Sequence, residues 1–97
     1  MNMRLIVDGA FVPALAAHMR LRFDNARQSW TIQAPERSFL LDQNAHAIVS
    51  RCDGTASLDA IIDSICAVFT EAPRDMVAKD VTALVQNFVD KSVMVQR

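Results

Sequence analysis

The sequence predicts an α+β domain with a three-stranded antiparallel sheet followed by three α-helices, in a winged helix-turn-helix-like arrangement. Apolar and polar residues alternate in the first half of the chain, whereas apolar residues recur every three or four positions in the second half. A length of 97 residues is sufficient for one hydrophobic core and too short for two. The strands precede the helices, which is atypical for a DNA-binding winged helix.

Three short strands are expected between residues 18 and 41. Apolar and basic residues alternate in Met19–Phe23, which is typical of a half-buried strand. A turn rich in Asp and Asn leads to Ser29–Gln33, the expected hairpin partner of the first strand. Pro35 interrupts the pattern because it lacks a ladder donor, and Ser38–Leu41 is predicted as a third, shorter strand.

The two chain ends carry weaker signals. Residues 1–17 show no clear period, and we expect them to form a flexible arm ahead of a domain that spans residues 18–97. The apolar stretch Ala10–Ala17 contains Pro13 and is shorter than the ~20 residues of a membrane span. Because this run is too short to span a membrane, the sequence predicts a cytoplasmic protein that does not contact a membrane. At the other end of the chain, Val93–Val95 is expected to be extended.

Three helical stripes follow the strands. Asp42 is the expected N-cap of the first helix, and Gly54 is expected to end it with a positive φ. Ser57 is the expected N-cap of the second helix. Pro73 opens the third helix, and Lys91 lies in its last turn. The apolar stripes are Ala45, Ile48, Val49 and Cys52, then Leu58, Ile61, Ile62, Ile65, Cys66 and Phe69, then Val77, Val81, Leu84, Val85 and Phe88.

The sequence contains no motif that indicates catalysis or metal binding. Its soft candidate ligands are His18, His46, Cys52 and Cys66. No pair of them has a spacing typical of a metal site, and both cysteines are expected to be reduced and inert. With only two glycines there is no phosphate-binding loop, and no nucleophile motif is present. We therefore expect no catalytic residue, no cofactor and no metal.

The charge balance argues against nucleic acid as a partner. The formal net charge is -1, whereas a non-specific nucleic-acid binder needs a basic face. The third helix carries Arg74, Lys79 and Lys91 beside as many aspartates, so it lacks the excess of cations that follows a phosphate backbone. A winged-helix DNA-binding regulator remains the alternative function, and a small enzyme subunit is a third.

The third strand is a candidate binding edge. An edge strand presents unpaired N–H and C=O groups, and Ser38–Leu41 is unusually apolar for such a position. An extended peptide can add to such an edge as a further strand. The pattern is equally compatible with Phe39 and Leu41 in the core and a chance exposure of Leu40, so both interpretations stay open.

Several short motifs resemble a known family. They are Pro13, Leu21–Asp24, Ala34–Arg37, Leu41–Asp42, Cys52–Thr55, Leu58–Phe69 and Asp80–Phe88. In their order and spacing they resemble the PqqD family, the small peptide chaperones of pyrroloquinoline quinone biosynthesis, over residues 13–97. The sequence departs from the family at Ser92, where a glycine is expected after the last helix. Because serine is strained in the left-handed region, we expect a differently built cap.

The resemblance implies a non-catalytic domain that recognises the precursor of a ribosomally made peptide. It implies binding of the precursor peptide PqqA, presented to the radical S-adenosylmethionine enzyme PqqE, without a cofactor of its own. The peptide is expected to lie as an added strand beside the third helix, oriented by the charged rim residues Arg37 and Lys79. The expected peptide-binding residues are Arg37, Ser38, Phe39, Leu40, Leu41, Val77, Val81, Leu84 and Phe88.

Overall fold

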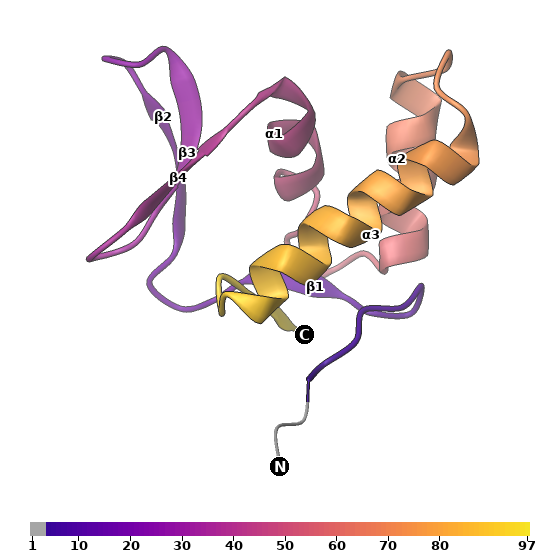
Figure 1. Ribbon diagram of the computed structural model, residues 1–97, viewed down its shortest axis with the longest axis horizontal. Coiled ribbons are helices and arrows are strands. Elements are labelled where there is room, and N and C mark those ends of the chain that lie inside the picture. Colours follow the sequence, from indigo (N-terminus) through magenta and orange to yellow (C-terminus); the bar gives the residue numbers. More distant parts are fainter. Residues whose placement is uncertain (1–3) are drawn as a thin grey trace.

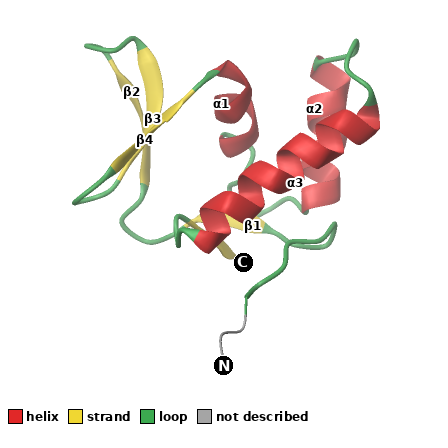
Figure 2. Ribbon diagram, viewed as in Figure 1, coloured by secondary structure: helices red, strands yellow, loops and turns green. Residues whose placement is uncertain are grey.

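The computed structural model describes residues 4–97 as an α+β domain with three helices and two antiparallel sheets (Figures 1 and 2). The strands are β1 (Pro13–Leu15), β2 (Arg20–Asp24), β3 (Ser29–Gln33), β4 (Ser38–Leu41) and β5 (Met94–Gln96). The helices are α1 (Gln43–Val49), α2 (Leu58–Val68) and α3 (Arg74–Asp90). The predicted α+β class is confirmed, but residues 4–97 hold five strands where three were expected.

The larger sheet has the order β2-β3-β4, and its antiparallel register aligns apolar residues into cross-strand rows. Trp30 lies opposite Phe23 on one side and Leu41 on the other, and Ile32 lies opposite Phe39 on β4. Residues that face each other across strands share one face of a sheet. This face therefore collects the apolar side chains and turns toward α1 and α3, as Figure 1 shows.

The predicted N-caps of the first two helices are confirmed. The Asp42 carboxylate accepts a hydrogen bond from Ala45 N at 2.7 Å, and the Ser57 hydroxyl accepts one from Ala60 N at 3.2 Å. Each contact satisfies one of the backbone donors that a helix start leaves unpaired.

The predicted stop of the first helix is wrong in position. The helix ends at Val49 with Ser50 as its C-cap, four residues before Gly54. Gly54 does have the expected positive φ, 85°, but it serves a turn that docks on β1: its N–H donates to Pro13 O at 3.0 Å. This hydrogen bond and a bridge between Asp53 and Ala14 join the turn to β1.

The chain before β2 differs from the expected arm. Phe11 is 1% exposed, Val7 and Ala14 are also buried, and β1 pairs with β5 from the other end of the chain. Residues 4–17 thus belong to the folded domain, and the expectation of a separate arm is wrong for them. Residues 1–3, which the same expectation included, lie outside the described residues. Pairing between the two ends buries apolar side chains that the local pattern leaves unassigned.

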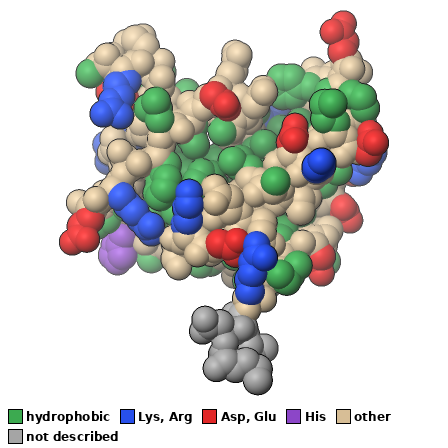
Figure 3. Space-filling view, viewed as in Figure 1, with side chains coloured by type: hydrophobic (Ala, Val, Ile, Leu, Met, Phe, Trp, Pro, Cys, Tyr) green, Lys and Arg blue, Asp and Glu red, His purple; other side chains and the backbone are tan. Residues whose placement is uncertain are grey.

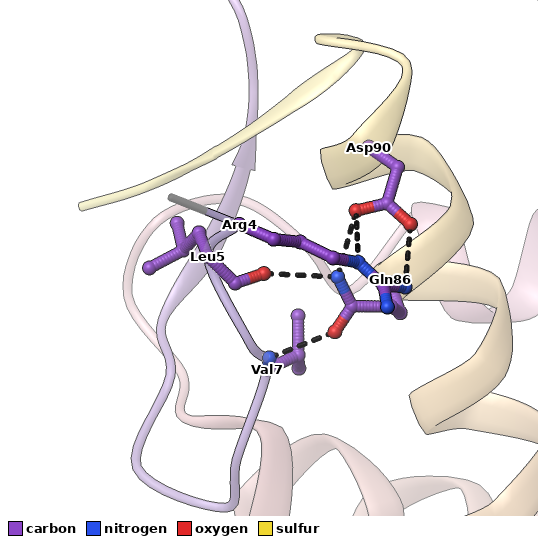
Figure 4. A network of polar contacts seen from close by, with 5 residues as sticks. All are labelled: Arg4, Leu5, Val7, Gln86 and Asp90. Atoms are coloured by element: carbon purple, nitrogen blue, oxygen red, sulfur yellow. Dashed lines mark hydrogen bonds and ion pairs between the residues drawn. The ribbon is translucent and has the colours of Figure 1, made fainter. Parts of the chain in front are cut away.

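The segment ahead of β1 is held on α3 by side-chain contacts (Figure 4). Gln86 accepts a hydrogen bond from Val7 N and donates one to Leu5 O, both at 2.9 Å, much as a neighbouring strand would. Arg4 donates twice to the Asp90 carboxylate, at 3.0 and 2.7 Å. The bonds from Arg4 and, to a smaller extent, one hydrogen bond from Gln86 Nε2 hold the pKa of Asp90 below its ordinary value.

The third helix ends in a left-handed residue although no glycine is present. Ser92 has a φ of 62°, so the expectation of a differently built cap is wrong. Ser92 N donates to Val89 O at 3.0 Å and Val93 N donates to Phe88 O at 2.8 Å. These two bonds are those of a Schellman motif, which satisfies the last carbonyls of the helix. Serine therefore adopts the strained conformation that the motif requires, and the chain turns directly into β5.

These two positive-φ positions predict opposite effects on stability. Gly54→Val should lower the free energy of unfolding by at least ~1 kcal/mol, because valine disfavours a positive φ. An added Cβ would also lie 3.0 Å from the Arg97 side chain. Ser92→Gly should raise it by about 0.5–1 kcal/mol by removing strain. Urea unfolding measures both changes, and equal effects of the same sign would contradict the assignment.

The Gln86 contacts predict a local loss of protection. Gln86→Ala should leave Val7 N without its acceptor and lower the free energy of unfolding by about 1–2 kcal/mol. Hydrogen exchange should then show fast exchange of the Val7 amide. Arg4→Ala is the control and should change stability little, because its ion pair is exposed. Arg4 lowers the pKa of Asp90 from its ordinary value of 3.8. The stability that the Arg4–Asp90 ion pair contributes should therefore be lost as the pH falls below 3.8. A protected Val7 amide in Gln86→Ala would contradict this account.

Candidate functional site

The strand β4 forms one edge of the larger sheet, as predicted. Ala34 N donates to Arg37 O at 2.9 Å where the β3–β4 ladder begins. In an antiparallel pair the hydrogen-bonded positions alternate, so every second residue after Arg37 faces β3. The backbone groups of Ser38 and Leu40 consequently point away from β3 toward the open edge. They present N–H donors and C=O acceptors at the spacing that an added strand requires.

The side chains of β4 divide between the two faces of the sheet. Leu41 is 5% exposed and belongs to the core, and Phe39 is half-buried beside it. Leu40 lies on the opposite face and is 58% exposed. Phe39 and Leu41 therefore pack inward, as the second interpretation expects, and Leu40 is exposed on the open edge that the first interpretation requires.

The start of β4 meets the end of α3 through Phe39. The Phe39 ring packs edge-on against Phe88, with 5.7 Å between ring centroids. The Arg37 guanidinium lies 5.4 Å from the Phe39 ring centroid and the Lys91 ammonium lies 5.7 Å from it. Arg37 Nη2 also donates to Lys91 O at 2.9 Å. Two cations thus flank one ring at this end of the site.

A hollow of about 190 Å³ lies among the three helices, close to the point where β4 leads into α1. Its walls include Asn44 and Ile48 of α1, Ile65 and Phe69 of α2, and Met76, Val77, Asp80 and Val81 of α3. Figure 3 shows hydrophobic side chains gathered in the middle of this face, between the sheet and α3. The described surface therefore combines an open strand edge with an apolar depression that carries one carboxylate, Asp80.

The predicted helix residues are less accessible than expected. Val77, Val81 and Phe88 are buried, with 7, 1 and 4% of their surface exposed, because the same stripe packs the core. Val77 and Val81 still line the hollow, whereas Phe88 lies behind Phe39. Leu84 is half-buried on the same side of α3. Of the helix positions predicted, Leu84 is the accessible one, and Val77 and Val81 form the floor of the hollow.

The sequence argument missed the residues beside the stripe. Met76 is 56% exposed, and Asp80 follows it by one helical turn on the flank of the hollow. Asn44 faces the same hollow from α1. On a helical wheel Met76 and Asp80 lie next to Val77 and Val81, so a stripe widened by one position toward the hollow would have included them. Asn44 carries no comparable signal, since only the tertiary fold brings α1 to this place.

One predicted rim residue lies on the wrong side of α3. Lys79 precedes Gln86 by seven residues, so the two share one helix face. Gln86 contacts Leu5 and Val7, so this face is the one covered by the N-terminal segment. Lys79 therefore lies away from β4, and Lys91 occupies the rim in its place. Arg37 is exposed just before the start of β4.

The described residues include one buried cysteine whose reactivity follows from its surroundings. Burial, aided by Asp53, raises the pKa of the Cys52 thiol to about 12, and its Sγ donates to Ile48 O at 3.2 Å. A neutral, hydrogen-bonded thiol is not a nucleophile. Within residues 4–97, no three side chains of His, Cys, Asp or Glu gather at a metal-binding distance. None of the described helices is long and apolar enough to cross a membrane.

An open strand edge beside an apolar helix flank is the arrangement of small domains that accept an extended segment as an added strand. The chain belongs to the PqqD family: the family model, coenzyme PQQ synthesis protein D, matches residues 29–93. It is 40% identical to a PqqA binding protein of Rhodopseudomonas palustris, over 96% of this chain and 90% of that protein. It is 34% identical to a PqqA binding protein of Gluconobacter oxydans, over 93% of this chain and 92% of that protein.

Two solved structures are similar to the fold. The solution structure of the PqqD part of Methylobacterium extorquens PqqCD aligns with a TM-score of 0.78 at 30% identity, over 93% of this chain and 95% of that one. That protein is described as a functional and stand-alone recognition element for ribosomally synthesized and post-translationally modified peptides. The crystal structure of PqqD from Xanthomonas campestris aligns with a TM-score of 0.55 at 38% identity, over 82% and 88% of the two chains.

The orientation of the β4 backbone predicts how proline is tolerated there. Leu40→Pro should change the free energy of unfolding by less than about 1 kcal/mol, because the lost N–H faces the edge and bonds to no strand. Leu41→Pro should lower it by at least ~2 kcal/mol, since it removes a ladder donor and a buried side chain. Thermal unfolding followed by circular dichroism checks both. Equal destabilisation by the two substitutions would show that the edge is assigned wrongly.

Proposed function

We propose that this protein is a non-catalytic peptide chaperone of pyrroloquinoline quinone biosynthesis, which binds the precursor peptide PqqA and presents it to the radical S-adenosylmethionine enzyme PqqE. The observation that carries the proposal is the open β4 edge, where the backbone groups of Ser38 and Leu40 face outward. Membership of the PqqD family and relatives named PqqA binding proteins support the identity of the peptide.

In the proposed complex the peptide pairs with β4 and places apolar side chains against α3. Each ladder hydrogen bond contributes a net ~0.5–1.5 kcal/mol, whereas ordering the peptide backbone costs ~1–2 kcal/mol per residue. Backbone pairing therefore does little more than offset the ordering cost. Affinity must come from apolar anchors, each worth ~1.5–3 kcal/mol when fully buried. The hollow of about 190 Å³ beside Met76 and Val81 provides a place for one of them.

The predicted contact residues take different parts in this proposal. Ser38 and Leu40 bind through their backbone, and Arg37 binds from the rim. Phe39 and Leu84 offer side-chain surface, Val77 and Val81 form the floor of the hollow, and Leu41 and Phe88 support the site from the core. We propose that residues 18–97 supply the recognition surface of the single domain, with the helices and the larger sheet arranged like a winged helix-turn-helix. We place the protein in the cytoplasm, where the free thiols of Cys52 and Cys66 remain reduced.

The alternative, a winged-helix DNA-binding regulator, has less support from charge. The helix α3 carries two cations and three aspartates, and one of its cations, Arg74, is paired with Asp63 of α2. A recognition helix that contacts phosphates needs free cations. A gel shift at low salt separates the two functions, because a DNA binder shows affinity there that falls steeply as salt is added.

The edge assignment predicts where the peptide protects the backbone. With a synthetic PqqA peptide added, hydrogen exchange should slow at the amides of Ser38 and Leu40, and NMR shifts should change at Met76 and Leu84. Leu40→Pro should abolish binding, since it removes an edge donor, whereas Leu40→Ala keeps the N–H and should retain most of the affinity. Perturbation confined to β2, or equal binding by Leu40→Pro and the unchanged protein, would contradict the proposed mode.

A further inference from the structure

Two cations without an ionic partner flank the ring at the start of β4. Arg37 and Lys91 are both exposed, and their charged groups lie 5.4 and 5.7 Å from the Phe39 ring centroid. Among residues 4–97 neither forms an ion pair, whereas Arg4, Arg27 and Arg74 each lie beside an aspartate. The particular feature of this pair is that two like charges lie together over one ring with no described carboxylate beside them.

Structural roles account for only part of this arrangement. Arg37 Nη2 donates to Lys91 O at 2.9 Å, which caps the end of α3 and is favoured by the helix dipole. A guanidinium has five N–H donors and an ammonium has three. The remaining donors of both cations have no described acceptor in the protein. The Phe39 ring holds the guanidinium in place through a cation–π contact, which leaves those donors ready for a carboxylate.

The cations lie within reach of a strand added to β4. A residue directly opposite Phe39 on such a strand has its side chain on the same face, with its Cβ about 4.5–5.5 Å from that of Phe39. Its carboxylate then comes beside both cations. Residues an even number of positions away along the added strand also face inward, toward α3 and the hollow. The hollow is mostly apolar and carries the carboxylate of Asp80 in place of a cation.

We propose that Arg37 and Lys91 form a carboxylate-binding subsite that sets the register of the docked peptide. The peptide would place an Asp or Glu opposite Phe39 and an apolar anchor an even number of residues away, toward the end of β4. The Asp80 carboxylate at the hollow repels an acidic side chain there, so the reversed placement is disfavoured. This inference rests on the proposed function, and it adds the side-chain chemistry that the peptide needs.

A double-mutant cycle on the full chain tests the subsite. A synthetic PqqA peptide and variants in which each Asp or Glu is replaced singly by Asn or Gln are titrated calorimetrically. The proteins are the unchanged chain, Arg37→Gln, Lys91→Gln and the control Lys79→Gln, whose cation lies on the opposite side of α3. Arg37→Gln and Lys91→Gln should each weaken binding about tenfold and reduce its salt dependence, while Lys79→Gln should do neither. Lys91→Gln keeps the carbonyl that Arg37 contacts, so its effect is independent of the helix cap.

One acidic position of the peptide should couple to these cations. Its replacement should weaken binding to the unchanged protein about a hundredfold, but only about tenfold with Arg37→Gln or with Lys91→Gln, because one cation then remains. The subsite would be overturned if, at every acidic position, the peptide substitution weakened binding to the variants as much as to the unchanged protein. An equal loss of affinity with Lys79→Gln would overturn it as well. Both outcomes would leave the proposed function intact. Absence of binding between the unchanged protein and the unchanged peptide would overturn the proposed function itself, and the subsite with it.

Discussion

The edge-on packing of Phe39 against Phe88 is the contact on which the rest of the site depends. It brings the start of β4 to the end of α3, although the two residues are far apart in the sequence. Once this contact is made, the free edge of β4 lies beside the helix flank that carries Leu84. The rim cations Arg37 and Lys91 come together for the same reason, because each adjoins one of the two packed elements.

The chain ends hold α3 in this position. Ser92 adopts a left-handed conformation that turns the chain from α3 into β5, and β5 pairs with β1. The segment before β1 then lies on the opposite face of α3, where Gln86 and Asp90 bind it. The helix is therefore supported on its core side and on one flank. The flank that faces β4 keeps its accessible side chains, which is where the proposed peptide lies.

Recognition through an edge strand separates affinity from specificity. Backbone pairing with Ser38 and Leu40 accepts any extended sequence, since it uses groups that every residue except proline possesses. Selectivity must come from side chains at alternate positions, where the fold provides an apolar hollow near Met76 and a cationic rim around Phe39. A domain of this size can support such a surface without enclosing an active site.

The sequence by itself determined the elements whose signals are local. Alternation located β2 and β3, and a short apolar run after Pro35 located β4. The caps Asp42 and Ser57 marked the starts of two helices, because a capping bond joins residues only three apart. The positive φ of Gly54 also followed from the residue type. The tertiary structure alone decided the role of residues 4–17, whose pairing and burial involve segments some eighty positions away. It also decided which apolar residues of α3 are exposed, because the elements packed against the helix determine which part of its apolar stripe is buried. Pairing over such distances leaves no periodic trace in the chain, so it becomes visible only when the folded contacts are known.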